Sequence, residues 1–361
     1  FLRTHKHTFY GLTSIPSDGF RSRGFVELLY LPQFGVSERS SHALHRHERS
    51  FCWSSVRIGA DGKTEIGQNH EANSDNYFHQ TTAALTMRLI WMTDIHLNFV
   101  SSKDVNDLVK SIVAETADAV LIGGDIAEAD SLDDRLIELA NGIQIPLYFV
   151  LGNHDYYRSS ITQVRNAMLR LSQRVPNLTW LPQAGVVQLT KDTALIGHGG
   201  WGDGRAGKYR SSILLNDFFL IDELQVTHGS LDPDPETVLC DSLQVTLQKL
   251  GDEAAEHFRV HLTSALETSC HVVLLTHVPP FIETCWHNGG ISDDYWAPHF
   301  TCQAVGAVLR EIMSSHEQQQ LTVLCGHTHS SGLVQILPNL KVVTGEAVYG
   351  EPCVQDVLDI T

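Results

Sequence analysis

Five short apolar segments of this chain each end abruptly in a cluster of polar side chains. The clusters are Asp94-Ile-His96, Gly124-Asp125, Gly152-Asn153-His154-Asp155, Thr276-His277 and Gly326-His327-Thr-His329. Short, wholly apolar runs are typical of strands that are buried on both faces. Because open α/β sheets carry their sites at the carboxyl ends of their strands, the pattern predicts an α/β fold that gathers carboxylates and imidazoles along one edge.

The residues between these clusters complete the α/β pattern. Apolar side chains at helical spacing predict helices over residues 102–116, 132–140, 161–173, 252–266 and 302–313. Strands are expected over residues 89–92, 119–122, 145–151, 178–181, 186–189, 194–197, 271–275, 321–325, 333–337 and 340–344. Alternating strands and helices in the first half predict a largely parallel sheet, whereas the three short strands within residues 178–197 are expected to be antiparallel. Residues 206–250 lack a clear period, so we expect helix and loop there, with an exposed turn at 231–235.

The segment before the first apolar strand differs from the rest of the chain. Residues 1–86 carry nine Lys and Arg against eight Asp and Glu, whereas the remainder carries 16 against 34. Their apolar residues form short clumps without a sustained period, and the first Met of the chain is Met87. We therefore expect residues 1–86 to be an extension that is disordered or not native, and residues 87–361 to form the functional domain. A genuine N-terminal extension is the alternative.

The composition limits which binding partners and which cellular compartment are expected. The formal net charge of −17 argues against broad electrostatic binding to long nucleic acids, which requires a basic surface. The seven cysteines form no C-x-x-C pair, which argues against a disulfide framework or a structural zinc site and favours a reducing, cytoplasmic compartment. No apolar run approaches the about 18 residues of a membrane span, so no membrane association is expected. The oligomeric state is left open.

The residue types at the strand ends are those of a metal centre. Residues two apart on an extended chain share one side, so Asp94 and His96 can point to one spot beyond their strand. Carboxylate oxygens and imidazole nitrogens together bind first-row divalent ions. A single cluster of this kind is compatible with a solvated turn. Five clusters in series, three of them next to glycine, favour a shared metal site.

The five motifs in this order resemble those of the calcineurin-like metallophosphoesterases, D-x-H, G-D-x-x, G-N-H-D/E, a lone H and G-H-x-H. The resemblance covers residue 87 to about residue 344, and it implies a four-layer α/β/β/α sandwich with two mixed β-sheets. It also implies a dinuclear site for Mn, Fe, Zn or Co ions. One ion would be held by Asp94, His96, Asp125 and His329, and the other by Asp125, Asn153, His277 and His327. Asp125 would bridge the two ions.

The same resemblance implies a mechanism. The ions lower the pKa of a bridging water, and the resulting hydroxide attacks phosphorus in line while the ions neutralise the phosphoryl oxygens. His154 resembles the residue that stabilises the developing charge and protonates the leaving oxygen as general acid. Glu128 occupies the place where relatives carry an acidic partner for that histidine, which would keep the imidazole protonated. The alternative for Glu128 is a surface carboxylate.

Motif details favour one branch of the family. The residues after Asp125 read Ile-Ala-Glu-Ala-Asp130, without the arginine of protein Ser/Thr phosphatases and symmetric dinucleotide hydrolases. Glu128 replaces the metal-binding tyrosine of purple acid phosphatases. The chain is most similar to small bacterial-type phosphoesterases, including cyclic-nucleotide phosphodiesterases, so we expect a phosphodiesterase or phosphatase acting on a small phosphorylated substrate. A nuclease of the same superfamily and a non-catalytic scaffold with the same fold are the alternatives.

Two loops are candidates for substrate contact. Trp201 and Arg205 lie in a Gly-rich loop that could face the metals, where the guanidinium fork of Arg205 would hold a phosphate oxygen. His287 lies soon after His277, in a loop rich in Trp, His and Asp. The alternative for each residue is a structural role in packing the loop on the core.

Overall fold

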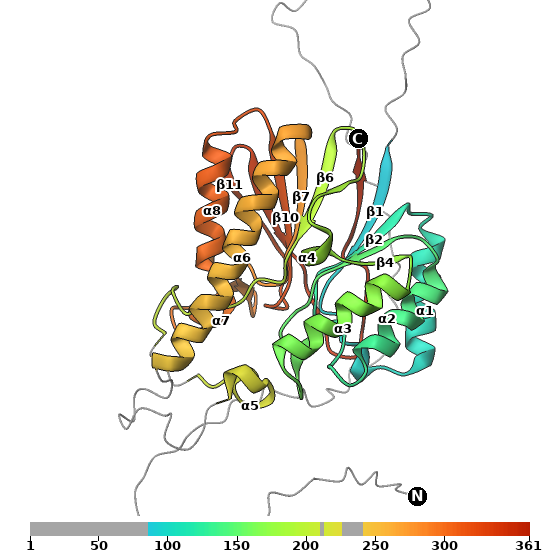
Figure 1. Cartoon of the computed structure of the whole chain (residues 1–361), viewed down its shortest axis with the longest axis horizontal. Helices are drawn as coiled ribbons and strands as arrows, with labels where there is room; N and C mark the ends of the chain where they lie inside the picture. Colours follow the sequence, from blue (N-terminus) through green and yellow to red (C-terminus); the bar gives the residue numbers. More distant parts are fainter. Residues whose placement is uncertain (1–85, 210–212, 226–240) are drawn as a thin grey trace, which may run out of the picture. The chain divides into compact units, whose positions relative to one another are not determined.

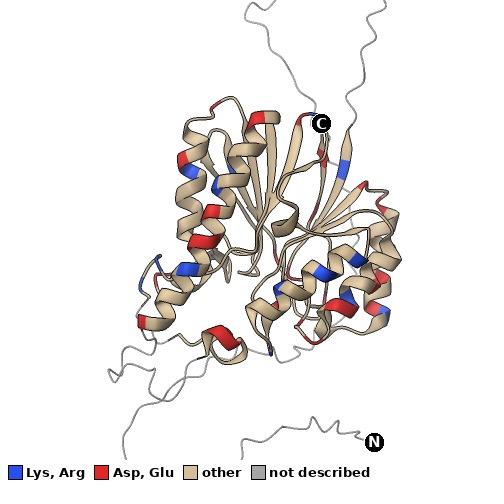
Figure 2. Ribbon diagram, viewed as in Figure 1, with Lys and Arg blue, Asp and Glu red and all other residues tan. Residues whose placement is uncertain are grey.

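The computed structural model describes residues 86–209, 213–225 and 241–361. The extension expected over residues 1–86, apart from its last residue, and the turn expected at 231–235 lie outside these ranges. In the described part of the chain, two large β-sheets carry helices on their outer faces (Figure 1). Charged residues are concentrated on these helices, as the outer layer of a globular fold requires (Figure 2).

The first sheet is built from the expected βαβ units and has the strand order β13-β1-β2-β3-β4. Its strands are β1 (Met87–Met92), β2 (Ala119–Ile122), β3 (Leu147–Phe149), β4 (Leu178–Trp180) and β13 (Asp356–Ile360). The strands β1 to β4 are parallel, and β13 pairs antiparallel with β1. Their connections contain the helices α1 (Ser102–Ala114), α2 (Leu132–Ile143) and α3 (Ile161–Arg174).

The second sheet has the order β11-β12-β10-β7-β6-β5. Its strands are β5 (Val187–Gln188), β6 (Thr193–Gly197), β7 (His271–Leu275), β10 (Gln320–Cys325), β11 (Gly332–Leu337) and β12 (Leu340–Thr344). The four central strands are parallel, and the edge strands β5 and β11 are antiparallel to their neighbours. The long helix α6 (Asp241–Thr268) and helix α8 (Gln303–Ser314) cover its outer face.

Short elements line the loops between these strands and helices. They are η1 (Leu97–Phe99), η2 (His154–Tyr156), α4 (Leu181–Ala184), α5 (Asp217–Leu220), η3 (Asp222–Leu224), η4 (Ile282–Thr284), β8 (Trp286–His287), β9 (Gly290–Ile291) and α7 (Ala297–Phe300). Among the described helices, none combines the length and the apolar character of a membrane span.

Three apolar cores separate the layers of backbone. Side chains alternate along a strand, so on β1 the side chains of Ile90 and Met92 pack in the core with α1 to α3, whereas Leu89 and Trp91 pack between the two sheets. A third core lies between the second sheet and helices α6 and α8. The resulting order of helix, sheet, sheet and helix confirms the four-layer α/β/β/α sandwich, and burial on both faces explains why the strands are apolar throughout.

Several elements differ from the expectation. The strands expected over 178–181 and 194–197 are parallel to their neighbours rather than antiparallel, because β4 extends the first sheet and β6 pairs with β7 in the second. The helix expected over 252–266 begins at Asp241. Strand β13 has no counterpart in the sequence analysis, since its edge position leaves two of its five side chains as exposed aspartates and weakens the apolar signal.

Candidate metal centre

The polar clusters meet because they follow neighbouring strands. Within the first sheet, β1, β2 and β3 lie side by side, and within the second sheet β7 lies beside β10. Parallel neighbours bring their carboxyl ends to the same edge. Seven expected ligands follow these strand ends, namely Asp94 and His96 after β1, Asp125 after β2, Asn153 after β3, His277 after β7, and His327 and His329 after β10.

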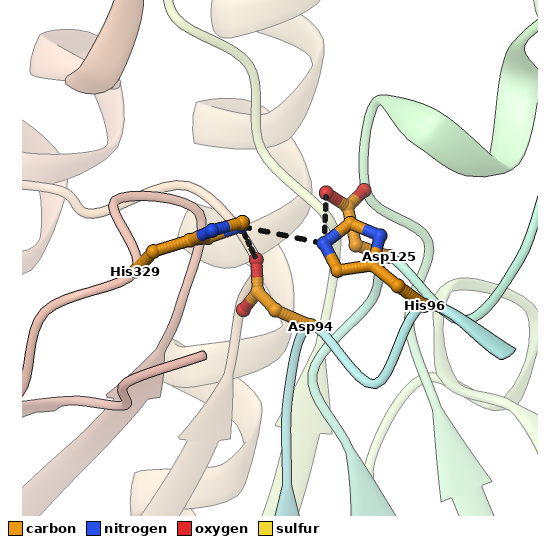
Figure 3. A group of neighbouring side chains, drawn as sticks. All are labelled: Asp94, His96, Asp125 and His329. Carbon is orange, nitrogen blue, oxygen red and sulfur yellow. Dashed lines mark hydrogen bonds and ion pairs between the residues drawn. The ribbon is translucent and has the colours of Figure 1, made fainter. Parts of the chain in front are cut away.

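Four of these residues form one compact group. A single ligand atom from each of Asp94, His96, Asp125 and His329 lies within 4.8 Å of the other three (Figure 3). The Nε2 atoms of His96 and His329 are 3.3 Å apart. The Nε2 atom of His329 is 3.3 Å from Asp94 Oδ1, and that of His96 is 3.8 Å from Asp125 Oδ2. Two carboxylates and two imidazoles that converge in this way could hold a divalent ion.

The carboxylates of this group need a cation. Asp94 and Asp125 are buried, and no Lys or Arg of the described residues pairs with either of them. Burial raises the pKa of Asp125, and the nearby Asp94 carboxylate raises it further. Burying such charges is costly unless an opposite charge compensates them, so the donor set fits a bound metal ion.

A second group of ligand atoms surrounds His277. Its Nε2 atom lies 3.2 Å from Asn153 Oδ1, 3.2 Å from His327 Nδ1 and 3.4 Å from Asp125 Oδ1. The two oxygens of the Asp125 carboxylate are thus divided between the groups, with Oδ2 toward His96 and Oδ1 toward His277. This division is what a carboxylate shared by two ions requires.

In the second group, His277 and His327 each direct an unprotonated ring nitrogen, which can only accept, toward the other ligands. His277 Nδ1 donates to the carbonyl oxygen of Gly123, and His327 Nε2 donates to that of His299. Burial lowers the pKa of His277, and it lowers that of His327 to about 3, so both rings are neutral at pH 7. Their remaining nitrogens therefore face each other as lone pairs. A cation satisfies such an arrangement, and the backbone bonds orient the rings toward it.

Asp217 in helix α5 sets the orientation of the Asn153 amide. Asn153 Nδ2 donates to Asp217 Oδ1 over 2.9 Å, and the hydroxyl of Tyr157 donates to the same oxygen over 2.7 Å. Because the amide nitrogen is held by Asp217, the amide oxygen faces His277. Sequence reasoning missed Asp217, which lies 64 residues from Asn153 in a stretch without motif or period.

Five of the expected ligands have a strained backbone conformation. Asp94, His96, Asp125, His327 and His329 all have positive φ angles, between 40° and 71°. Residues other than glycine adopt this region rarely, and each instance costs of order 1–3 kcal/mol. Such conformations persist only where the surrounding contacts impose them, and they cluster at functional sites.

Glycines within the motifs let the loops approach the carboxylates. A Cβ atom on Gly152 would collide with Asp125, and one on Gly326 would collide with Asp94. Asp155, the last residue of the Gly-Asn-His-Asp motif, joins two of the loops by accepting hydrogen bonds from the backbone N–H groups of Ile126, Ala127 and Gly152 over 2.8–2.9 Å. Sequence reasoning assigned no role to Asp155.

His154 lies at the edge of the metal group. Its Nε2 atom is 3.9 Å from Asp125 Oδ2, and its ring packs on that of Tyr157 with centroids 4.3 Å apart. Burial and the imidazoles of His329 and His277 lower the pKa of His154 to about 3. This direction is opposite to the one expected from an acidic partner.

Glu128 is not the partner of His154. It forms an ion pair with Arg158 and accepts a hydrogen bond from Asn98 Nδ2 over 3.3 Å. Within the described part of the chain, His154 Nδ1 has no hydrogen-bond partner. The expected pair fails because Arg158, whose backbone adopts φ 64°, brings a permanent cation to the carboxylate.

The guanidinium of Arg205 forms ion pairs with two aspartates. Its guanidinium lies 3.0 Å from Asp203 and 2.7 Å from Asp252, and it also donates to the backbone carbonyl of Gln248. These contacts engage part of the donor set that a phosphate would require, and the contact of Arg205 with a phosphate stays a prediction.

Trp201 and His287 lie near expected ligands. Trp201 is buried and lines a small cavity together with Asn153 and His327. His287 donates from Nδ1 to the carbonyl oxygen of Thr328, which stands between the two histidines of the last motif. Both residues support the loops of the site, and contact with a substrate stays a prediction for each.

Tyr349 belongs to the site, although no sequence motif marks it. It follows β12, and its ring centroid lies 4.5 Å from that of His96, 5.1 Å from that of His329 and 6.2 Å from that of His154. Burial raises the pKa of its hydroxyl, and the carboxylate of Asp125 adds to this effect.

The fold and the candidate site together define an α/β protein that carries a set of potential metal ligands directly after the carboxyl ends of its strands. The chain matches the calcineurin-like phosphoesterase family over residues 87–331, and it belongs to that family. An uncharacterized metallophosphoesterase of Helicobacter pylori (strain J99) is 33% identical over 81 residues. That match spans only 20% of this chain and 20% of the relative.

Two solved structures show the extent of the likeness. A dimetal phosphatase from Danio rerio is 11% identical, with a TM-score of 0.46 over 75% of this chain and 91% of that one. The phosphopantetheinyl hydrolase of Mycobacterium tuberculosis is 12% identical, with a TM-score of 0.49 over 74% of this chain and 94% of that one.

Proposed function

We propose that the protein is a metal-dependent hydrolase of small phosphate esters that holds two divalent ions. The observation that carries this proposal is the division of the Asp125 carboxylate between two groups of ligand atoms, Oδ2 beside His96 and Oδ1 beside His277. When bound, such ions supply positive charge for the phosphoryl oxygens and lower the pKa of the attacking water. Mn²⁺ is the first ion to test, because a mixed nitrogen and oxygen ligand set accepts it.

The residues of the site have two kinds of proposed role, holding the ions and orienting a ligand. Asp94, His96, Asp125 and His329 would hold one ion, and Asp125, Asn153, His277 and His327 the other. Asp217 and Tyr157 fix the amide of Asn153, so that its neutral oxygen keeps the site positive enough to attract a phosphate. Burial strengthens these electrostatic interactions, since the local dielectric is low.

We assign to His154 the role of assisting the leaving group. Its ring packs on that of Tyr157 at an interplanar angle of 30°, and its Nε2 lies 3.9 Å from Asp125 Oδ2, at the edge of the proposed ion site. From this position His154 would donate a hydrogen bond to the leaving oxygen. To pass a proton as well, its lowered pKa must rise when the anionic phosphate binds beside it. Such proton transfer typically contributes about 10²- to 10⁴-fold to the rate.

The surface of the protein supports a small substrate rather than a long nucleic acid. Figure 2 shows Lys and Arg on the helices interspersed with Asp and Glu, whereas a groove for nucleic acid would need clustered cations. The five cysteines in the described ranges are free, which supports the proposal of a reducing, cytoplasmic compartment.

The test is metal reconstitution followed by two parallel assays. Metal-stripped protein should be inactive, and Mn²⁺ should restore hydrolysis of bis-p-nitrophenyl phosphate, a diester, or of p-nitrophenyl phosphate, a monoester. His154→Ala should reduce kcat by about 10²- to 10⁴-fold while the metal content stays unchanged. Monoester turnover alone would assign a phosphatase. Protein that holds two ions but turns over neither ester would contradict the proposed function.

A further inference from the structure

Two partly exposed aromatic side chains pack beside the candidate metal centre. Phe99 is 53% exposed and Tyr349 is 37% exposed. Their ring centroids lie 5.1 Å apart at an interplanar angle of 74°, so the rings meet edge to face. Single exposed apolar residues are ordinary in proteins, but a pair of aromatic rings in contact with each other beside a metal centre is a specific arrangement.

Both rings pack against His96, one of the expected metal ligands. Phe99 belongs to η1, three residues after His96, and its centroid is 6.1 Å from that of the His96 ring. Tyr349 comes from residues 345–355, far away in the sequence, and packs 4.5 Å from the same ring. A ligand on these two rings would therefore lie next to an ion held by His96.

The segment that carries Tyr349 is anchored at its base. The side chain of Gln355 accepts a hydrogen bond from the backbone N–H of Glu346 over 2.9 Å and donates one to its carbonyl over 2.7 Å. The N–H of Glu351 bonds to the carbonyl of Val348, which closes a turn around Tyr349. The partly exposed Tyr349 side chain thus lies on a loop with defined hydrogen bonds.

The position of His154 indicates which part of a substrate these rings would meet. The ring of Tyr349 is 6.2 Å from that of His154, the residue to which the proposed function assigns the leaving oxygen. The charged residues of segment 345–355 are Glu346 and Glu351, which disfavour a second phosphate there. An uncharged, flat group on the leaving alcohol matches this environment.

We propose that Phe99 and Tyr349 form a stacking platform for an aromatic ring in the leaving alcohol of the substrate, which makes aryl-type phosphate esters the preferred class. The inference rests on the proposed function for the direction in which the alcohol leaves. Aromatic pairs contribute beyond the area that they bury, so the platform distinguishes a flat ring from an aliphatic ring of similar size.

Calorimetric binding of three phosphonates to the Mn²⁺-reconstituted protein tests the platform without requiring turnover. Phenylphosphonate should bind about two- to tenfold more tightly than cyclohexylphosphonate, and methylphosphonate should bind most weakly. In the Phe99→Ala/Tyr349→Ala double variant the phenyl and cyclohexyl affinities should become equal, while methylphosphonate affinity changes less than twofold. Val260→Ala, which truncates an equally exposed apolar residue on helix α6, is the matched control and should preserve the wild-type order.

The outcomes separate the platform from the proposed function. Equal binding of the two ring phosphonates by the wild type, or an unchanged preference in the double variant, would overturn the platform. A parallel loss of all three affinities in the double variant would also overturn it, since the rings would then merely support the histidines. Hydrolysis of bis-p-nitrophenyl phosphate by the same preparations reports on the proposed function, which can fail while the ring preference stands.

Discussion

Among the residues that the structure describes, histidines gather in two places, and the two clusters are built differently. In the metal centre, imidazoles converge with the carboxylates of Asp94 and Asp125. The second cluster consists of His198, after β6, and His257 and His261 on helix α6, with ring centroids 5.2 Å and 4.3 Å apart along the series. Across the described ranges, only the metal centre contains a group of three or more potential ligands whose atoms converge.

The contrast shows that imidazoles alone do not make a metal site. In the metal centre, His277 uses Nδ1 to bond a backbone carbonyl and so directs its other nitrogen at Asp125. In the second cluster, His198 accepts a hydrogen bond from the backbone N–H of Gly200, and its neighbouring ring is another histidine. Burial lowers the pKa of His198 well below its usual value, and it lowers that of His257 to about 4. The rings of His198 and His257 pack as neutral aromatic groups, and no converging set of ligands from the described residues surrounds them.

The largest effect should come from removing the shared carboxylate. Asp125→Asn should abolish binding of both ions and reduce kcat/KM by more than about 1,000-fold, beyond the 10- to 100-fold typical of residues that only support ligands. Metal analysis of purified protein and hydrolysis of bis-p-nitrophenyl phosphate measure these effects. His257→Gln is the matched change in the second cluster and should leave both quantities within twofold. Full metal content in Asp125→Asn would show that the comparison between the clusters is mistaken.

A smaller effect should follow from releasing the amide of Asn153. Asp217→Ala leaves Asn153 Nδ2 and the Tyr157 hydroxyl without their shared acceptor, so the amide oxygen loses its fixed direction. We expect Mn²⁺ affinity to fall by about 10- to 100-fold, measured by titration calorimetry. Asp222→Ala, at an exposed carboxylate nearby in the chain, is the control. Unchanged affinity in Asp217→Ala would show that ligand orientation does not depend on this hydrogen bond.

The convergence of the expected ligands could be predicted because their signal is local. Asp94 and His96 share one strand end, and His327 and His329 share another, each after a wholly apolar strand. The same local signal predicted the parallel strands β1 to β3 and the helices between them. Strand β13 escaped prediction because an edge strand with exposed aspartates lacks the apolar run that marks the buried strands.

Residues that reach the site through tertiary packing could not be predicted. Asp217 and Tyr349 come from segments with neither a motif nor a period, and only the folded chain brings them to the metal group. The contacts of Glu128 and Arg205 could not be predicted either, because they come from tertiary packing. Glu128 pairs with Arg158 rather than with His154, and Arg205 pairs with aspartates from its own loop and from helix α6.

The smallest predicted effect lies in the second cluster and concerns pH. The pKa of His257 in the folded protein is lowered from 6.5 to about 4 by burial and by His261. The pKa of the neighbouring His198 is lowered by burial, by His257 and by the positive charge of Arg165 on α3. Because the unfolded chain binds a proton at His257 first, the stability that this residue contributes is present above pH 6.5 and is lost as the pH falls toward 4.

Between pH 7.5 and pH 5 we expect wild-type protein to lose about 1–2 kcal/mol more unfolding free energy than His257→Gln, which cannot titrate. Urea denaturation of metal-free protein at the two pH values measures the difference, and the absence of metal keeps the ligand histidines from contributing through metal release. If both proteins lose the same free energy, His257 is already solvated in the folded state. The second cluster would then be a surface feature rather than a packed counterpart to the metal centre.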